Sequence, residues 1–145
     1  MNSSLKRAAA AVACGLLVSG LAGGAKAVST SAFKGEQHEV AQALSDLQAD
    51  VTASDEKKIC ANDLARAIVA RLDASPGGCR KAIKDQLAEI DNDELAVESG
   101  GVQLGPGAPP RRATARVRTI FSGKTARSTL SLVKEGNRWK VSGLG

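Results

Sequence analysis

The sequence predicts an α+β domain in which three N-terminal helices pack on a curved antiparallel sheet of three to four strands. Apolar residues recur at helical spacing between residues 36 and 90, and from Leu95 onwards they alternate with polar residues. The chain has 145 residues, which suits one domain and leaves no room for a second. We therefore expect one cone-like domain over residues 36–145.

The first 27 residues have the layout of a secretory signal peptide. Lys6 and Arg7 precede an uncharged apolar run, and residues 25–27 (Ala-Lys-Ala) form a small-x-small cleavage site. We expect cleavage near Ala27 and a secreted or cell-surface protein. Lipoprotein processing at Cys14 is the less favoured alternative, because the apolar stretch before this cysteine is short.

Cleavage would leave a flexible mature N-terminus over residues 28–35 and two cysteines, Cys60 and Cys79. An even pair in an exported chain predicts a disulfide, here closing a loop of 19 residues. A redox-active pair normally has Cys-x-x-Cys spacing, which these cysteines lack. We therefore expect a structural bridge.

The helical segments follow from apolar stripes and their boundaries. A first helix has its stripe at Val40, Leu44, Leu47 and Val51. A second helix begins at residues 54–56 (Ser-Asp-Glu), with an N-cap and first-turn acids, and ends at residues 75–78 (Ser-Pro-Gly-Gly). A third, shorter helix extends over about residues 79–90.

The strand segments are separated by Gly-containing turns. We expect a strand over residues 95–104 with a bulge at Gly100-Gly101, and strands over residues 113–121, 125–134 and 138–144. A consistent apolar face places Val117 opposite Ser128 and Leu132 opposite Trp139. The expected core comprises Val40, Leu44, Leu47, Leu64, Ile68, Ile83, Leu87, Val117, Leu130, Leu132, Trp139 and Val141.

The net charge of +5 is divided unevenly along the chain. Residues 28–98 contain eight basic and fourteen acidic residues, whereas residues 99–145 contain nine basic residues and one acid, Glu135. The polar face of the predicted sheet is correspondingly basic. It carries Arg116, Arg118, Arg127, Arg138 and Lys140. This face is either an ordinary solvated surface or a contact for an anionic membrane, wall polymer or acidic partner.

The helix-then-meander order and the ending Gly-Asn-Arg-Trp-Lys-Val at residues 136–141 resemble a known group. It is the nuclear transport factor two-like, or cystatin-like cone, superfamily of small exported domains. The positions of Cys60 and Cys79 resemble its actinobacterial secreted members. The resemblance implies that Trp139 plugs the open end of the sheet. It implies no catalytic residue, because isomerase-like relatives use a tyrosine and this chain has none.

Other chemistries find little support in the sequence. His38 is the only histidine and has no marked nucleophile nearby, so we expect a solvated helical side chain. Residues 91–102 have Ala96 and Val102 where a calcium loop needs its glycine and its final glutamate, and two cysteines with one histidine do not complete a zinc site. We expect no cofactor, no metal site and, because only three residues are aromatic, no nucleic-acid partner.

These observations favour an exported, non-enzymatic binding or accessory module for a small ligand or a protein. One alternative is a small-pocket isomerase or dehydratase. It would need two facing titratable groups, for which His38, Asp46, Asp50 and the acids of the third helix are the candidates. The other alternative is an electrostatic adaptor that uses the basic sheet face.

Overall fold

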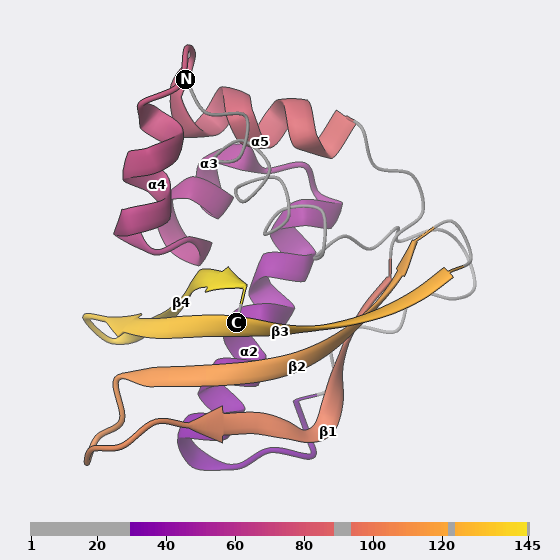
Figure 1. The fold of residues 1–145 in the computed structure, drawn as a ribbon, viewed down its shortest axis with the longest axis vertical. Helices are drawn as coiled ribbons and strands as arrows, with labels where there is room; N and C mark the ends of the chain where they lie inside the picture. Colours follow the sequence, from indigo (N-terminus) through magenta and orange to yellow (C-terminus); the bar gives the residue numbers. More distant parts are fainter. Residues whose placement is uncertain (1–29, 89–93, 122–123, 145) are drawn as a thin grey trace.

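The computed structural model describes residues 30–88, 94–121 and 124–144, and it has the expected α+β architecture (Figure 1). Four helices precede a four-stranded antiparallel sheet whose order, β1-β2-β3-β4, follows the sequence. The expected signal peptide and its cleavage site lie outside the described residues. None of the helices in the described part of the chain is long and apolar enough to span a membrane.

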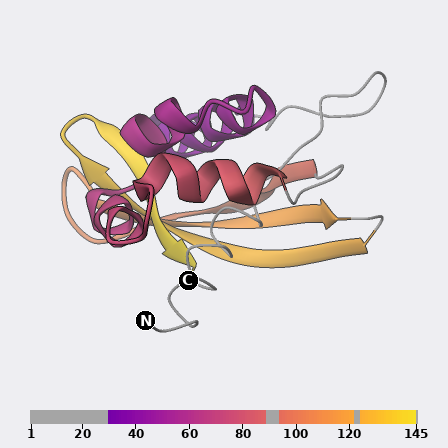
Figure 2. The same ribbon diagram turned by 90° about the horizontal axis from the view of Figure 1, so that it is seen from above.

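The helices are α2 (Gly35–Thr52), α3 (Glu56–Lys58), α4 (Arg66–Asp73) and α5 (Gly78–Ala88). The strands are β1 (Glu94–Leu104), β2 (Arg112–Phe121), β3 (Lys124–Glu135) and β4 (Arg138–Leu144). Helix α2 crosses one face of the sheet, and α3, α4 and α5 gather beyond its β4 edge (Figures 1 and 2). The opposite face of β2 and β3, turned towards the viewer in Figure 1, carries no described helix.

The prediction of one continuous second helix is wrong. It is divided into α3, a π-helical turn over Ile59–Asp63 (η1), and α4. Leu64 between them is extended and forms a parallel bridge with Val141, and the Ala65 amide donates to the Val141 carbonyl over 2.8 Å. Pairing with the edge of β4 therefore replaces helical hydrogen bonds at this point. It also covers an edge that would otherwise be open.

Two local boundaries differ slightly from expectation. Asp55, rather than Ser54, caps α3, and its carboxylate accepts from the Lys58 amide at 3.0 Å. Part of the segment expected to be a flexible N-terminus is anchored, because Phe33 is 6% exposed and packs in the core. The amide of Phe33 also donates to the Thr30 carbonyl in a turn just before α2.

The core lies between α2 and the covered face of the sheet. All the expected core residues are buried except Leu87, which is partly buried and packs against the cluster. The largest fully buried side chains come from α2, η1 and strands β2 to β4: Leu44, Leu47, Ile59, Leu130, Leu132, Val40, Val117 and Val141. Small residues on β2, Ala113 and Ala115, let α2 approach the sheet closely.

The sheet register is partly as expected. Val117 lies opposite Ser128, as predicted, and the β1–β2 register shifts between Val97 and Val102, around the predicted bulge. The predicted pairing of Leu132 with Trp139 is wrong, because Leu132 lies opposite Val141. The turn at residues 136–137 pairs Glu135 with Arg138, so Trp139 lies opposite Lys134 instead.

Candidate functional site

A disulfide joins Cys60 on η1 to Cys79 on α5, with 6.2 Å between the two Cα atoms. Cys79 is buried and Cys60 packs against the core. The Cys79 amide donates to the Asp73 carboxylate over 2.8 Å, which fixes the tight connection between α4 and α5. The bridge therefore holds the helical layer together, as the cysteine spacing predicted.

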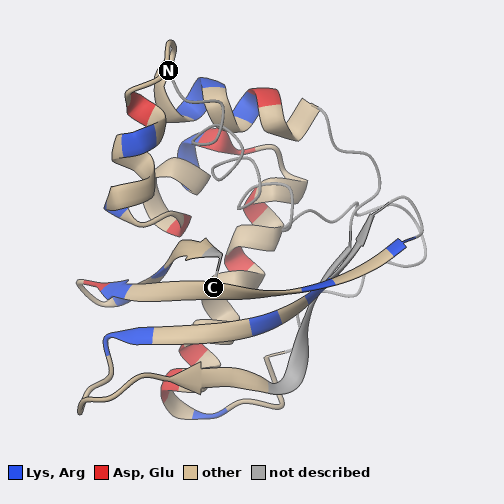
Figure 3. Ribbon diagram, in the orientation of Figure 1, with Lys and Arg blue, Asp and Glu red and all other residues tan. Residues whose placement is uncertain are grey.

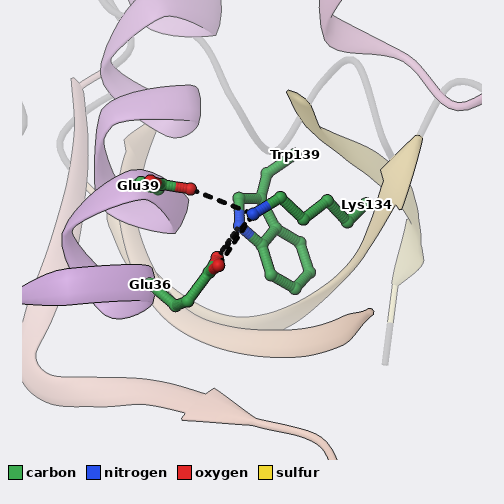
Figure 4. Close-up of polar contacts among 4 residues, drawn as sticks. All are labelled: Glu36, Glu39, Lys134 and Trp139. Carbon is green, nitrogen blue, oxygen red and sulfur yellow. Dashed lines mark hydrogen bonds and ion pairs between the residues drawn. The ribbon is translucent and has the colours of Figure 1, made fainter. Parts of the chain in front are cut away.

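Alternation along β3 places Lys134 on the same face as Leu130 and Leu132, and the register of the β3–β4 hairpin places it beside Trp139 (Figure 4). The Lys134 ammonium donates to both carboxylate oxygens of Glu36, at 2.8 and 2.9 Å, and to Glu39 at 3.2 Å. It also lies 5.7 Å from the centroid of the Trp139 ring. Trp139 is 4% exposed and donates its indole N–H to Glu36 over 2.9 Å.

This cluster of Glu36, Glu39, Lys134 and Trp139 is held by mutual electrostatic support. Hydrogen bonds from Lys134 and then from Trp139 lower the pKa of Glu36, and the bond to Glu36 raises the pKa of Lys134. Glu36 and Lys134 therefore both stay charged around neutral pH. It ties the first turn of α2 to the β3–β4 hairpin, and Trp139 occupies the expected core position with its polar edge satisfied.

A second polar group, which the sequence reasoning missed, surrounds Asp63 at the end of η1. Asp63 is 6% exposed, and its Oδ2 has no hydrogen-bond partner. Burial, followed by the nearby carboxylates of Asp50 and Asp46, raises the pKa of Asp63 to about 7, while Arg138 acts in the opposite sense. Nothing in the local sequence marks Asp63 as buried, because its burial follows from the break before α4.

The titratable residues considered for an enzyme are only partly brought together. Asp46 and Asp50 lie near Asp63, and Asp50 also forms an ion pair with Lys58 at 3.6 Å. His38 lies apart, at the start of α2, where its Nδ1 is 3.1 Å from the Thr30 carbonyl oxygen. Across the residues that the structure describes, no group of three His, Cys, Asp or Glu side chains is arranged to hold a metal ion.

The outer face of the sheet brings together three of the five predicted basic residues. Arg118 on β2 lies directly opposite Arg127 on β3, and Arg116 lies opposite Thr129. Arg112, two alternate positions further along β2, belongs to the same face. All four arginines are exposed. We refer to Arg112, Arg116, Arg118 and Arg127 as the arginine face.

Three members of the arginine face carry a charge that no ion pair neutralises within the described residues. No described carboxylate forms an ion pair with Arg112, Arg116 or Arg118. Two like charges directly opposite each other, as in Arg118 and Arg127, destabilise a sheet. The face therefore concentrates basic side chains on two neighbouring strands.

The two remaining predicted residues lie on β4, away from the arginine face. The Lys140 side chain is only 15% exposed, and its ammonium donates to the Ala61 carbonyl at 3.1 Å and lies 3.9 Å from Glu135. Arg138 is exposed but lies opposite Glu135 in the hairpin. The contact of η1 with β4 therefore removes Lys140 from the open basic surface.

The unequal charge of the chain becomes a spatial asymmetry in the fold. Residues 35–88, which form the helices, contain nine acidic and seven basic residues, whereas residues 112–144 contain eight basic residues and one acid. Figure 3 shows acidic and basic positions together on the helices and basic positions repeated along β2 and β3. The acidic excess of the helices lies on α2, whose 18 residues include four acids and no Lys or Arg, and the basic excess lies on β2 and β3, whereas β1 carries Glu94 and Glu98.

Comparison with protein-family models, curated proteins and solved structures finds no match to this chain. The arrangement of its own residues therefore carries the functional argument.

Proposed function

We propose that the mature chain is an exported, non-enzymatic binding module that contacts an anionic partner through the arginine face. The exposure of Arg116, Arg118 and Arg127 on one sheet face, with Arg118 directly opposite Arg127, is the observation that carries the proposal. Arginine also suits phosphate and carboxylate groups, because its planar guanidinium donates two parallel hydrogen bonds.

The proposal also includes export of the chain and its assignment to the cone-like family. One further feature supports each of these. A structural disulfide is typical of proteins that function outside the cytoplasm. The order of helices followed by an antiparallel meander, with Trp139 buried against α2, fits the nuclear transport factor two-like resemblance. Signal cleavage near Ala27 would release the chain just before the anchored residue Phe33.

The carboxyl pair of Asp50 and Asp63 favours a structural role over catalysis. An acid–base residue must reach its substrate, whereas Asp63 is 6% exposed and its Oδ2 is buried. The arginines are open to solvent by contrast. A surface contact therefore agrees better with the geometry than isomerase or dehydratase chemistry.

The proposal is tested by salt-dependent retention of the chain from Val28 onwards on a phosphocellulose column. The face variant, Arg118→Gln with Arg127→Gln, should elute at clearly lower salt than the parent. The matched helix variant, Arg71→Gln with Lys84→Gln, removes two exposed charges from α4 and α5 and should elute close to the parent. Equal shifts for the two variants would show that net charge alone governs retention, and the proposal would fail.

A further inference from the structure

Asp63 lies where the chain passes from η1 into its contact with the edge of the sheet. It is the last residue of η1, and Leu64 after it is extended and forms a parallel bridge with Val141 on β4. The Ala65 amide then donates to the Val141 carbonyl over 2.8 Å. A movement of Asp63 therefore acts directly on the contact that covers the edge of β4.

The surroundings of the Asp63 carboxyl disfavour a negative charge. Asp63 is 6% exposed, and its Oδ2 has no hydrogen-bond partner in the described part of the chain. The carboxylates of Asp46 and Asp50 on α2 lie near it. A charge on Asp63 would be buried beside two like charges, whereas the protonated carboxyl is neutral and donates a hydrogen bond to Asp50.

Nearby cations offset only part of this unfavourable environment. The charged groups that face Asp63 or the turn that it ends come from α2, α3 and β4: Asp46, Asp50, Lys58, Arg138 and Lys140. Lys58 pairs with Asp50, and Lys140 donates to the Ala61 carbonyl. On α5, the group bonded to η1 is Cys79, which carries no charge in the disulfide. Burial and the two acids outweigh Arg138 and raise the pKa of Asp63 to about 7.

We propose that Asp63 is a pH-sensitive switch on the contact between η1 and β4. While the carboxyl keeps its proton, it stays buried beside Asp50, and Leu64 stays paired with Val141. When the proton passes to solvent, the carboxylate gains hydration by turning the end of η1 outward, and this releases the edge of β4. The inference goes beyond the proposed function and does not depend on the arginine face.

The test follows hydrogen exchange of the Ala65 amide by NMR between about pH 5 and pH 8, on the chain from Val28 onwards. This chain includes every described element and the complete described core. The protection factor, which corrects for the intrinsic exchange rate at each pH, should fall on the order of tenfold or more as pH rises, and the fall should level off above about pH 7. A protection factor that does not change with pH would overturn the proposal.

The response to urea separates local opening at η1 from unfolding of the whole domain. A local opening exposes little surface, so about 1 M urea should hardly change the protection factor of Ala65. The amide of Leu44, which is fully buried on α2, should exchange through global unfolding and lose protection in urea. If Ala65 responds to urea as strongly as Leu44, the contact opens only with the whole domain and the inference fails.

Three variants assign the pH dependence to Asp63. Asp63→Asn should remove the dependence of Ala65 protection on pH, because an amide does not ionise. Asp85→Asn is the matched control on the exposed face of α5, where Asp85 pairs with Lys81, and it should keep the dependence of the parent. Asp50→Asn removes a like charge and lowers the pKa of Asp63, so the loss of protection should be smaller than in the parent. A parent-like dependence in the Asp63→Asn variant would show that another group controls the contact and would overturn the inference.

Discussion

Trp139 on β4 donates its indole N–H to the carboxylate of Glu36 on α2, over 2.9 Å and across 103 residues of chain. The same carboxylate accepts both hydrogen bonds from Lys134. One acidic side chain thus satisfies the polar edge of the largest buried residue and the ammonium of a lysine on the covered face of β3. This is the point at which the helical layer and the last hairpin of the sheet are joined.

Glu36→Gln should lower stability, because the Lys134 ammonium loses its nearest counter-charge while it remains only 15% exposed. Glu39→Gln is the matched control, since Glu39 makes one longer bond to Lys134 and is 55% exposed. Urea unfolding at pH 7 should place the Glu36→Gln variant below the Glu39→Gln variant, and both below the parent. The reverse order would contradict the central role of Glu36.

The lowered pKa of Glu36 also predicts the direction of the acid dependence. A carboxyl whose folded pKa lies below its unfolded value contributes stability above the unfolded pKa, and this contribution is lost as pH falls through the folded pKa. The parent should therefore lose stability below about pH 4.5, and Glu36→Gln should lose less over the same window. Parallel stability–pH curves would argue against the ion cluster.

For Asp63 we expect the opposite dependence of stability on pH, at higher pH than for Glu36. Its folded pKa of about 7 exceeds the ordinary value of 3.8, so its favourable contribution is complete below about pH 3.8 and is lost as pH rises through about 7. Asp46, Asp50 and Arg138 are the charged groups that face it. Asp63→Asn should therefore gain stability relative to the parent between pH 4 and 8, as measured by urea unfolding.

The control for this prediction is Asp85→Asn, which changes an exposed carboxylate on α5 that is paired with Lys81. The difference in unfolding free energy between the Asp85→Asn variant and the parent should vary little across the same range of pH. If the unfolding free energies of the Asp63→Asn variant and the parent differ by the same amount at every pH in this range, Asp63 does not titrate between pH 4 and 8.

The sequence predicted those features that depend on local spacing. The stripe of Val40, Leu44 and Leu47, the two-cysteine bridge and the alternation along β3 each follow from helix period, cysteine number or strand period. The fold class and most of the core followed from them. The arginine face followed in part, because alternation alone places Arg116 and Arg118 on the polar side.

The features that sequence reasoning missed depend on contacts between distant segments. Leu64 leaves helical geometry because the β4 edge offers it a partner, and the apolar stripe shows no break there. Burial of Asp63 and withdrawal of Lys140 both follow from that contact. The pairing of Lys134 with Trp139 depends on a two-residue shift in hairpin register, which keeps every side chain on its own face and therefore leaves no trace in the alternation.

Opening the Cys60–Cys79 bridge should lower the unfolding free energy by about 3 kcal/mol, the chain-entropy estimate for a loop of this size. Cys60→Ala with Cys79→Ala avoids the effects of reductant on other parts of the assay. Urea unfolding of this variant and of the oxidised parent gives the difference. A loss close to zero would show that η1 and α5 hold their places without the bridge.

Gly77→Ala should destabilise the connection between α4 and α5. Gly77 has φ of +87°, which a residue with a Cβ adopts at a cost of about 1–2 kcal/mol, and the added Cβ would also meet the Lys81 side chain. Gly143→Ala is the matched control, because that glycine has no positive φ and open space around the Cβ position. Thermal melts should place the Gly77→Ala variant clearly below the parent and the Gly143→Ala variant close to it, since only the first substitution forces left-handed backbone on an L side chain. Equal melting temperatures for the two variants would show that the turn after α4 can relax its backbone without loosening Cys79 from the core.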